Sequence, residues 1–147
     1  MGATISACVR PSVSDDKHDD KCDANPILVI WDIENVRLPL PPISPSSVIE
    51  AVRKAAVAPF TRGNVKITCC VSPMSLRAME KRCPTFVRDA VPMMDLRIAC
   101  DARAPKLGAD YVLQREMTAF MQTAPRGARI VLITGDADFL GPVPVEK

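Results

Sequence analysis

Residues 26–35 read PILVIWDIEN, a continuous apolar run that ends in Asp32, Glu34 and Asn35. Residues 129–136 read RIVLITGD and have the same form, with Asp136 after the run. Strands of a parallel sheet are apolar on both faces because helices cover both sides of the sheet. The two runs therefore predict neighbouring strands of a parallel sheet, each of which delivers a carboxylate where it ends.

Further strands and helices alternate between these two runs. Ser44-Pro45 and Ser72-Pro73 each combine an N-cap residue with a proline at the first helical position. The pattern predicts strands over residues 27–31, 65–71, 96–100 and 129–134, and helices over residues 45–58, from residue 73 and from about residue 109. Residues 83–95 are predicted to be irregular. Alternation of this kind is typical of an α/β domain with a parallel sheet flanked by helices.

The composition sets the limits of the domain and of its partners. The chain has 147 residues, which suits one domain, and we predict a disordered tail over residues 1–25 before a domain over residues 26–147. A net charge of +2 does not indicate a nucleic-acid binder, and the single Trp and single Tyr argue against a base-stacking platform. Six cysteines without a C-x-x-C pair favour structural thiols in an intracellular, cytoplasmic setting over zinc or disulfides.

Polar and acidic side chains gather where the predicted strands end. Ligands of open parallel sheets bind beyond the carboxyl ends of the strands, so these side chains are candidates for a site. They are Asp32, Glu34 and Asn35 after the first apolar run, Asp136 and Asp138 after the last, and Asp110 in the first turn of the helix between them. A helix dipole favours a carboxylate in that first turn.

Three carboxylates from separate segments, Asp32, Asp110 and Asp136, are predicted to bind a metal ion together. Like charges are costly to assemble without a cation. Oxygen ligands with no His or Cys suit a hard ion such as Mg²⁺ or Mn²⁺. Such an ion lowers the pKa of a bound water and neutralises phosphate charge, which would permit cleavage of a phosphodiester.

Each acidic residue also has an ordinary structural interpretation. Acidic residues after strands often cap helices or form turns, so Asp138 could cap the segment that follows it and Asn35 could form an Asx-turn. The direction of Glu34 depends on whether the strand continues past Ile33. The metal-site hypothesis therefore depends on the convergence of three residues and not on any one of them.

Three motifs in order resemble one family. WDIEN at residues 31–35, KLGADYVL at residues 106–113 and LITGDADF at residues 132–139 resemble the NYN domain of the PIN-like ribonuclease superfamily. The first motif is close to the meiosis regulator and mRNA stability factor branch, which is of the limkain type. The resemblance covers residues 26–140.

This resemblance implies a PIN-like Rossmannoid fold and a metal-dependent endoribonuclease that cleaves single-stranded RNA in RNA turnover or regulation of gene expression. It implies Mg²⁺ or Mn²⁺ bound by Asp32, Asp110 and Asp136, with Asn35 and Asp138 as supporting catalytic residues. Family members of the limkain type also suggest an association with peroxisomes. Arg37, Arg103, Lys106 and Arg115 flank the motifs and are expected to meet RNA phosphates.

The sequence departs from the family after the third motif. Residues 141–144 read GPVP, which breaks a helix, so the last helix and edge strand of an NYN domain are expected to be missing. An exposed sheet edge would then favour self-association. The alternative functions are a non-catalytic RNA-binding or regulatory fragment and a Toprim-like or other Mg²⁺-dependent phosphohydrolase. A phosphohydrolase would carry a D-x-D-x-T/V motif after the first strand, and Asn35 beside Asp32 argues against Toprim.

The first residues carry a pattern of their own. Met1-Gly2-Ala3-Thr4-Ile5-Ser6 fits N-myristoylation of Gly2, and Cys8 could accept a palmitoyl chain. A membrane is a predicted partner only if Gly2 is acylated, and an ordinary flexible tail is the favoured alternative. No apolar run approaches the roughly 20 residues that span a bilayer.

Overall fold

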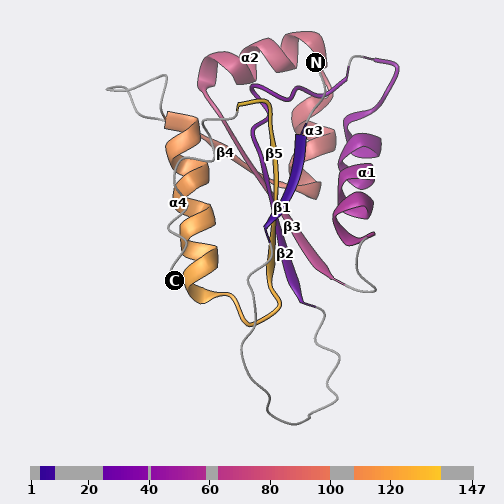
Figure 1. Cartoon of the computed structure of the whole chain (residues 1–147). Coiled ribbons are helices and arrows are strands. Elements are labelled where there is room, and N and C mark those ends of the chain that lie inside the picture. The colour runs from indigo at the N-terminus through magenta and orange to yellow at the C-terminus, as the bar shows by residue number, and fades with distance from the viewer. Residues whose placement is uncertain (1–3, 9–24, 40, 59–62, 100–107, 137–147) are drawn as a thin grey trace.

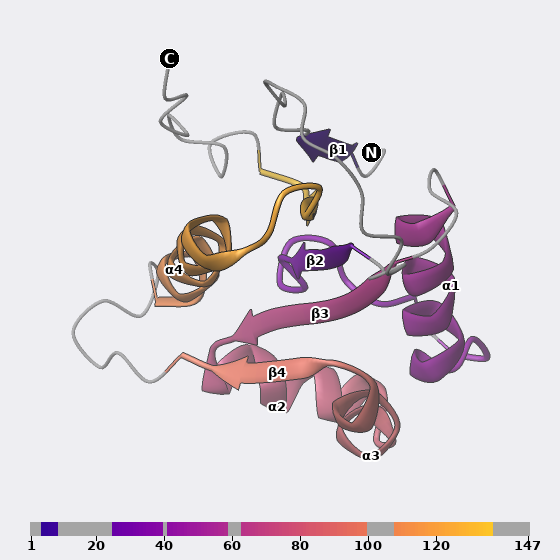
Figure 2. The same cartoon turned by 90° about the horizontal axis from the view of Figure 1, so that it is seen from below.

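A computed structural model describes residues 4–8, 25–39, 41–58, 63–99 and 108–136. One sheet of five strands forms its centre, with helices on both sides (Figures 1 and 2). The strands are β1 (Thr4–Cys8), β2 (Pro26–Trp31), β3 (Asn64–Val71), β4 (Asp95–Ile98) and β5 (Arg129–Thr134). The helices are α1 (Pro45–Val57), α2 (Pro73–Arg82), α3 (Phe86–Ala90), the 3₁₀ helix η1 (Val91–Met93) and α4 (Gly108–Thr123).

The strand order is β1-β5-β2-β3-β4. Strands β5, β2, β3 and β4 are parallel, which confirms the predicted α/β class with a parallel sheet flanked by helices. The chain proceeds from β2 outward to β3 and β4, and then returns to the other side of β2 to form β5. The strand order thus reverses between β2 and β5, and ligands of open α/β sheets bind at such a reversal.

Two apolar layers hold the helices on the sheet. The odd-numbered side chains of β2 and β3, including Val29 and Ile67, face α1 and α3 and form the larger layer with Ile49 and Phe86. The even-numbered side chains face α4, which covers them with Leu113. Figure 2 shows α4 on the opposite side of the sheet from α1. These apolar contacts fix α1 and α3 on one face of the sheet and α4 on the other.

Both predicted helix starts are confirmed. Ser44 and Ser72 have extended backbone conformations, and their hydroxyls accept hydrogen bonds from the amides of Ser47 and Ser75. The proline after each serine has no N–H to leave unsatisfied in the first turn. Because Ser72 follows the last residue of β3 directly, α2 begins at the carboxyl edge of the sheet and lies across its top in Figure 1.

Helix α4 is also fixed by charge. Glu116 forms ion pairs with Lys66 of β3 and with Arg97 of β4, with N···O distances of 3.2 and 2.6 Å. The same two cations contact Asp95, at 3.5 and 3.0 Å. A network of this kind loses less side-chain entropy per contact than an isolated surface pair, so it adds to the apolar anchoring of α4.

Two expectations are wrong in part. Residues 4–8, predicted to belong to a disordered tail, form β1, which pairs antiparallel with β5. Strand β1 therefore covers the outer edge of β5 within the same chain. Residues 86–93, predicted to be irregular, form α3 and η1, because Phe86 and Ala90 bury one face of a helical turn.

Some predictions fall on other parts of the chain. Gly2, residues 9–24, Arg103, Lys106, Asp138 and residues 141–144 lie outside the described residues. Within the described ranges, no helix combines the length and the apolar character needed to cross a bilayer.

Candidate active site

Asp32 occupies the strand reversal between β2 and β5. Its amide donates to the carbonyl of Ile133 at 2.9 Å, so the residue continues the pairing of the two strands by one step. The residue is only 3% exposed. A buried carboxylate needs hydrogen-bond partners, since leaving one without them costs several kcal/mol. The contacts around Asp32 meet that need.

Three donors hold the Asp32 carboxylate. Oδ2 accepts a hydrogen bond from the side-chain Nδ2 of Asn35 at 2.8 Å and another from the hydroxyl of Thr134 at 3.0 Å. Oδ1 accepts from the backbone N–H of Asn35 at 3.3 Å. A carboxylate offers about four lone-pair positions, so Oδ1 keeps capacity for a further ligand. Asp32 is thus both fixed in orientation and able to bind a cation.

Asn35 lies in the tight turn that follows Asp32. The amide of Val36 donates to the carbonyl of Asp32 at 2.8 Å, and the indole of Trp31 donates to the carbonyl of Val36 at 2.8 Å. The turn-forming role suggested for Asn35 therefore belongs to Asp32, whose side chain accepts the turn amide. Asn35 is exposed and presents its side chain beside the Asp32 carboxylate.

Thr134 connects the two strand ends and was not predicted as a site residue. Its hydroxyl donates to Asp32 and accepts the backbone N–H of Asp136 at 3.0 Å. Thr134 is 7% exposed, whereas Asp136 is exposed. One buried hydroxyl therefore sets the position of Asp136 relative to Asp32.

Asp110 faces these residues from the first turn of α4. Burial raises the pKa of Asp110 above its ordinary value, and the charges of Asp32, Asp136 and Glu34 raise it further. Charges act on one another in this way only over short distances in partly buried surroundings. The structure thus brings Asp32, Asp110 and Asp136, from three separate segments, to one edge of the sheet.

Glu34 turns away from the other carboxylates toward α2. Its Oε1 accepts from the backbone N–H of Ser72 at 2.8 Å and from the Ser72 hydroxyl at 2.9 Å. Burial opposes ionisation of Glu34, but hydrogen bonds from Ser75 and Ser72 bring its pKa below the ordinary value. Glu34 therefore ties the turn after β2 to the start of α2, and its side chain is already satisfied.

The donor set fits a hard divalent cation by its chemistry, since carboxylate and amide oxygens suit Mg²⁺ or Mn²⁺. Within the described residues, however, no three His, Cys, Asp or Glu side chains are close enough together to hold an ion. Asp32, Asp110 and Asp136 would hold the ion, with Asn35 as a neutral neighbour.

The nearby thiols are unsuited to metal binding. Burial raises the pKa of Cys69 to about 12, and burial with the charge of Glu34 raises the pKa of Cys70 to about 11. Both remain protonated at neutral pH, whereas metals bind the thiolate. Among the described residues, Cys69, Cys70 and Cys83 are free.

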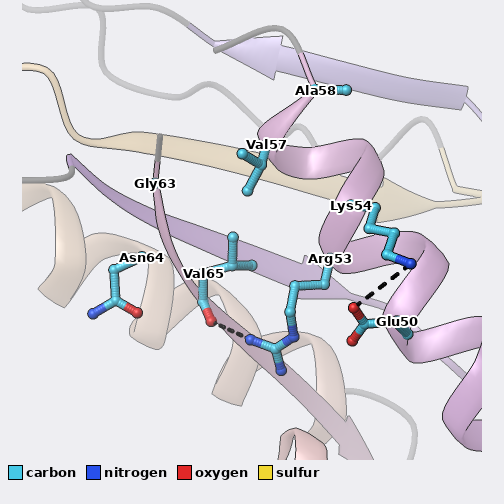
Figure 3. A pocket seen from close by; sticks show the side chains of 8 residues that line it. All are labelled: Glu50, Arg53, Lys54, Val57, Ala58, Gly63, Asn64 and Val65. Atoms are coloured by element: carbon cyan, nitrogen blue, oxygen red, sulfur yellow. Dashed lines mark hydrogen bonds and ion pairs between the residues drawn. The ribbon is translucent and has the colours of Figure 1, made fainter. Parts of the chain in front are cut away.

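A recess at the opposite edge of the sheet is a weaker candidate for a site. It lies between the end of α1 and the start of β3 (Figure 3). The guanidinium of Arg53 donates to the carbonyls of Val65 and Met93 at 2.7 and 2.6 Å, and Lys54 contacts Glu50 at 4.0 Å. These groups already have partners, so the chemistry favours the carboxylate edge over this recess.

Of the four basic residues predicted to meet RNA phosphates, the structure describes Arg37 and Arg115. Arg37 is exposed in the turn after β2, where its Nε donates to the carbonyl of Glu34 at 3.3 Å. Arg115 is exposed on α4. Both lie on segments that carry site residues, and among the described residues neither forms an ion pair with Asp32, Asp110 or Asp136.

Replacing Asp110 by asparagine should raise the melting temperature of the metal-free protein at neutral pH. Its raised pKa means that the folded state binds this proton more tightly than the unfolded chain does. Ionisation of Asp110 therefore costs stability as pH rises through the window between its ordinary pKa and its raised folded pKa. Thermal denaturation of both proteins in EDTA should show a gain at neutral pH that disappears in acid.

Glu34→Gln is the control for this variant, because the pKa of Glu34 is shifted in the opposite direction from that of Asp110. The lowered pKa of Glu34 contributes stability above its ordinary pKa, and this is lost as pH falls through the folded pKa. Glu34→Gln should therefore lower the melting temperature at neutral pH. A loss of stability in Asp110→Asn would show that the carboxylates do not repel one another at this edge.

Comparison with models of known families, with curated proteins and with solved structures found no match to the chain.

Proposed function

We propose that the chain is a metal-dependent endoribonuclease of the NYN type, which cleaves single-stranded RNA in RNA turnover or regulation of gene expression. The observation that carries the proposal is the grouping of Asp32, Asp110 and Asp136 near the strand reversal, where the charges of Asp32 and Asp136 add to burial in raising the pKa of Asp110. A nuclease needs such a group, because several carboxylates at one point attract the divalent cation that phosphate chemistry uses.

The roles of the residues follow from their contacts. Asp32, fixed by Thr134 and Asn35, would form the rigid side of the cation site. Asp110 and Asp136 would complete it from α4 and from the turn after β5. A bound Mg²⁺ or Mn²⁺ would supply Lewis acidity and an activated water. Asn35 has an exposed amide beside the site and could orient a phosphate oxygen by hydrogen bonding.

A second candidate function is supported by one observation. Because the described carboxylates do not converge within ligand distance of one another, a non-catalytic RNA-binding or regulatory role is the alternative. Both functions place the protein with RNA inside the cell. The free thiols at Cys69, Cys70 and Cys83 also favour a reducing compartment such as the cytoplasm.

The test is cleavage of a single-stranded RNA by the purified full chain with Mn²⁺ or Mg²⁺. Internal cleavage that EDTA abolishes is expected. In parallel, Mn²⁺ should raise the melting temperature, because a ligand that binds only the folded state stabilises it by about 2.7 kcal/mol at a concentration a hundred times its Kd. Binding of RNA with no cleavage under any metal condition would favour the non-catalytic alternative.

A further inference from the structure

Helix α2 carries a row of basic side chains on its outward face. Leu76 and Met79 pack against the larger apolar layer and so fix the inner face of the helix. Arg77 and Lys81 are one turn apart and exposed, and Arg82 follows them at the end of the helix. Residues four apart are neighbours on a helix surface, so Arg77 and Lys81 adjoin each other, and Arg82 adds a third cation at the end of the helix. We call these three cations the strip.

The charge of this strip is not neutralised within the part of the chain that the structure describes. Lys54, Lys66, Arg88 and Arg97 form ion pairs with nearby carboxylates. Arg77, Lys81 and Arg82 form none with described residues, and the helix carries one acidic residue, Glu80. Since the whole chain has a net charge of only +2, the positive potential of α2 is local.

The position of α2 connects this strip to the candidate active site. The Glu34 carboxylate holds the Ser72 end of α2 against the turn that contains Asn35. Arg37, from the same turn, lines a small recess together with Arg82. Helix α2 therefore begins at the carboxylate edge with its cap Ser72, and its basic side chains lie from the middle of the helix to its other end, where Arg82 and Arg37 line the same recess.

We infer that the outward face of α2, with Arg77, Lys81, Arg82 and neighbouring Arg37, binds the phosphates of the single-stranded RNA whose cleavage is proposed above. This inference rests on the proposed function, which supplies the substrate. A row of cations matches a chain of phosphates. Met74, which is 79% exposed at the end nearest the site, offers an apolar contact to an unstacked base. Duplexes keep their bases stacked inside, so this contact favours a single strand.

The simplest structural alternative is that Lys81 and Arg82 only complement the helix dipole, because they lie in the last turn of α2. That role would affect the stability of the helix and not RNA affinity. It also does not account for Arg77, which lies in the middle of the helix. Stability and binding must therefore be measured on the same variants.

The experiment compares two double variants that remove equal charge. Arg77→Gln with Lys81→Gln changes the strip. Lys54→Gln with Arg126→Gln changes exposed cations in the last turn of α1 and in the turn before β5, near the amino ends of the strands. Binding of a fluorescent oligouridylate of about ten nucleotides is measured by anisotropy. EDTA is present throughout, so that binding is measured without cleavage. Thermal denaturation checks that all proteins are folded alike.

The strip variant should bind roughly tenfold more weakly than wild type at low salt, and the control variant should bind like wild type. Between about 50 and 200 mM salt, the slope of log K against log salt should become shallower by about 1.4 for two lost contacts to a single strand. Duplex RNA of the same length should compete poorly. Equal losses in both double variants, no loss in the strip variant, or equal competition by duplex RNA or an acidic peptide would overturn the inference.

The two proposals fail separately. Cleavage with Mn²⁺ needs the carboxylates, whereas binding in EDTA needs only the strip. Cleavage by wild type with unchanged binding of the strip variant would refute the strip and leave the nuclease standing. Weakened binding by the strip variant without any cleavage by wild type would support the strip and refute the nuclease.

Discussion

Asp136→Asn should reduce Mn²⁺-dependent RNA cleavage by at least about a hundredfold while the protein keeps its fold. A metal ion stabilises the charge of the transition state by several kcal/mol, and each 1.36 kcal/mol corresponds to about tenfold in rate. Asparagine removes the negative charge that would attract the ion. It keeps the backbone N–H that donates to Thr134, and the side chain at this position is exposed. The melting temperature should therefore stay close to that of wild type.

Asp89→Asn is the matched control for this variant. Asp89 lies on α3 and pairs with Arg88 at 2.8 Å, and its charge is not among those that raise the pKa of Asp110. A surface pair of this kind contributes little to stability, so its loss should leave both cleavage and folding unchanged. Cleavage rates are measured in parallel on proteins purified identically. Equal cleavage by wild type and Asp136→Asn would point to a contaminating nuclease and against the assignment.

The parts of the fold that could be predicted from sequence are those with local signals. Residues 27–31 and 131–134 are buried, and a strand that is covered on both faces has no polar face to confuse the pattern. Ser44-Pro45 and Ser72-Pro73 start helices through contacts within three residues. The shared edge of Asp32 and Asp136 could be predicted because parallel strands end at a common edge.

The elements that were missed depend on distant partners or on interrupted patterns. Strand β1 exists through pairing with β5, which lies at the other end of the sequence, so its own residues carry little signal. In residues 83–95, Phe86, Ala90 and Met94 are buried at helical spacing. Pro84 precedes these residues and Pro92 lies between Ala90 and Met94, so the prolines obscured a signal at intervals of four residues.

The site details that were missed are side-chain contacts between separate segments. Thr134 is an ordinary strand residue by composition, and its hydroxyl reaches a carboxylate 102 residues away. Glu34 was ambiguous because its direction is decided by Ser72, at the start of α2. Contacts of this kind follow from the assembled fold and cannot be predicted from spacing along the chain.

Leu113→Ala should destabilise the protein by about 2–5 kcal/mol, the range measured when a buried leucine is truncated. Leu113 is fully buried and fills the apolar layer between α4 and the sheet, against Leu28 and Ile30 of β2. It lies one turn after Asp110, so it also anchors the part of α4 that carries a site carboxylate. A domain of this size is stable by about 5–15 kcal/mol in total, so the loss would be a large share of that.

Urea denaturation measures this effect through the midpoint and the slope of the transition. Leu113→Met keeps most of the side-chain volume and should cost less than about 1.5 kcal/mol, which makes it the control for packing. The ion pairs of Glu116 with Lys66 and Arg97 remain in both variants, so they cannot account for a difference between them. If alanine and methionine variants unfold at the same urea concentration, α4 is not held by Leu113. In that case the position of Asp110 would have to depend on the ion pairs instead.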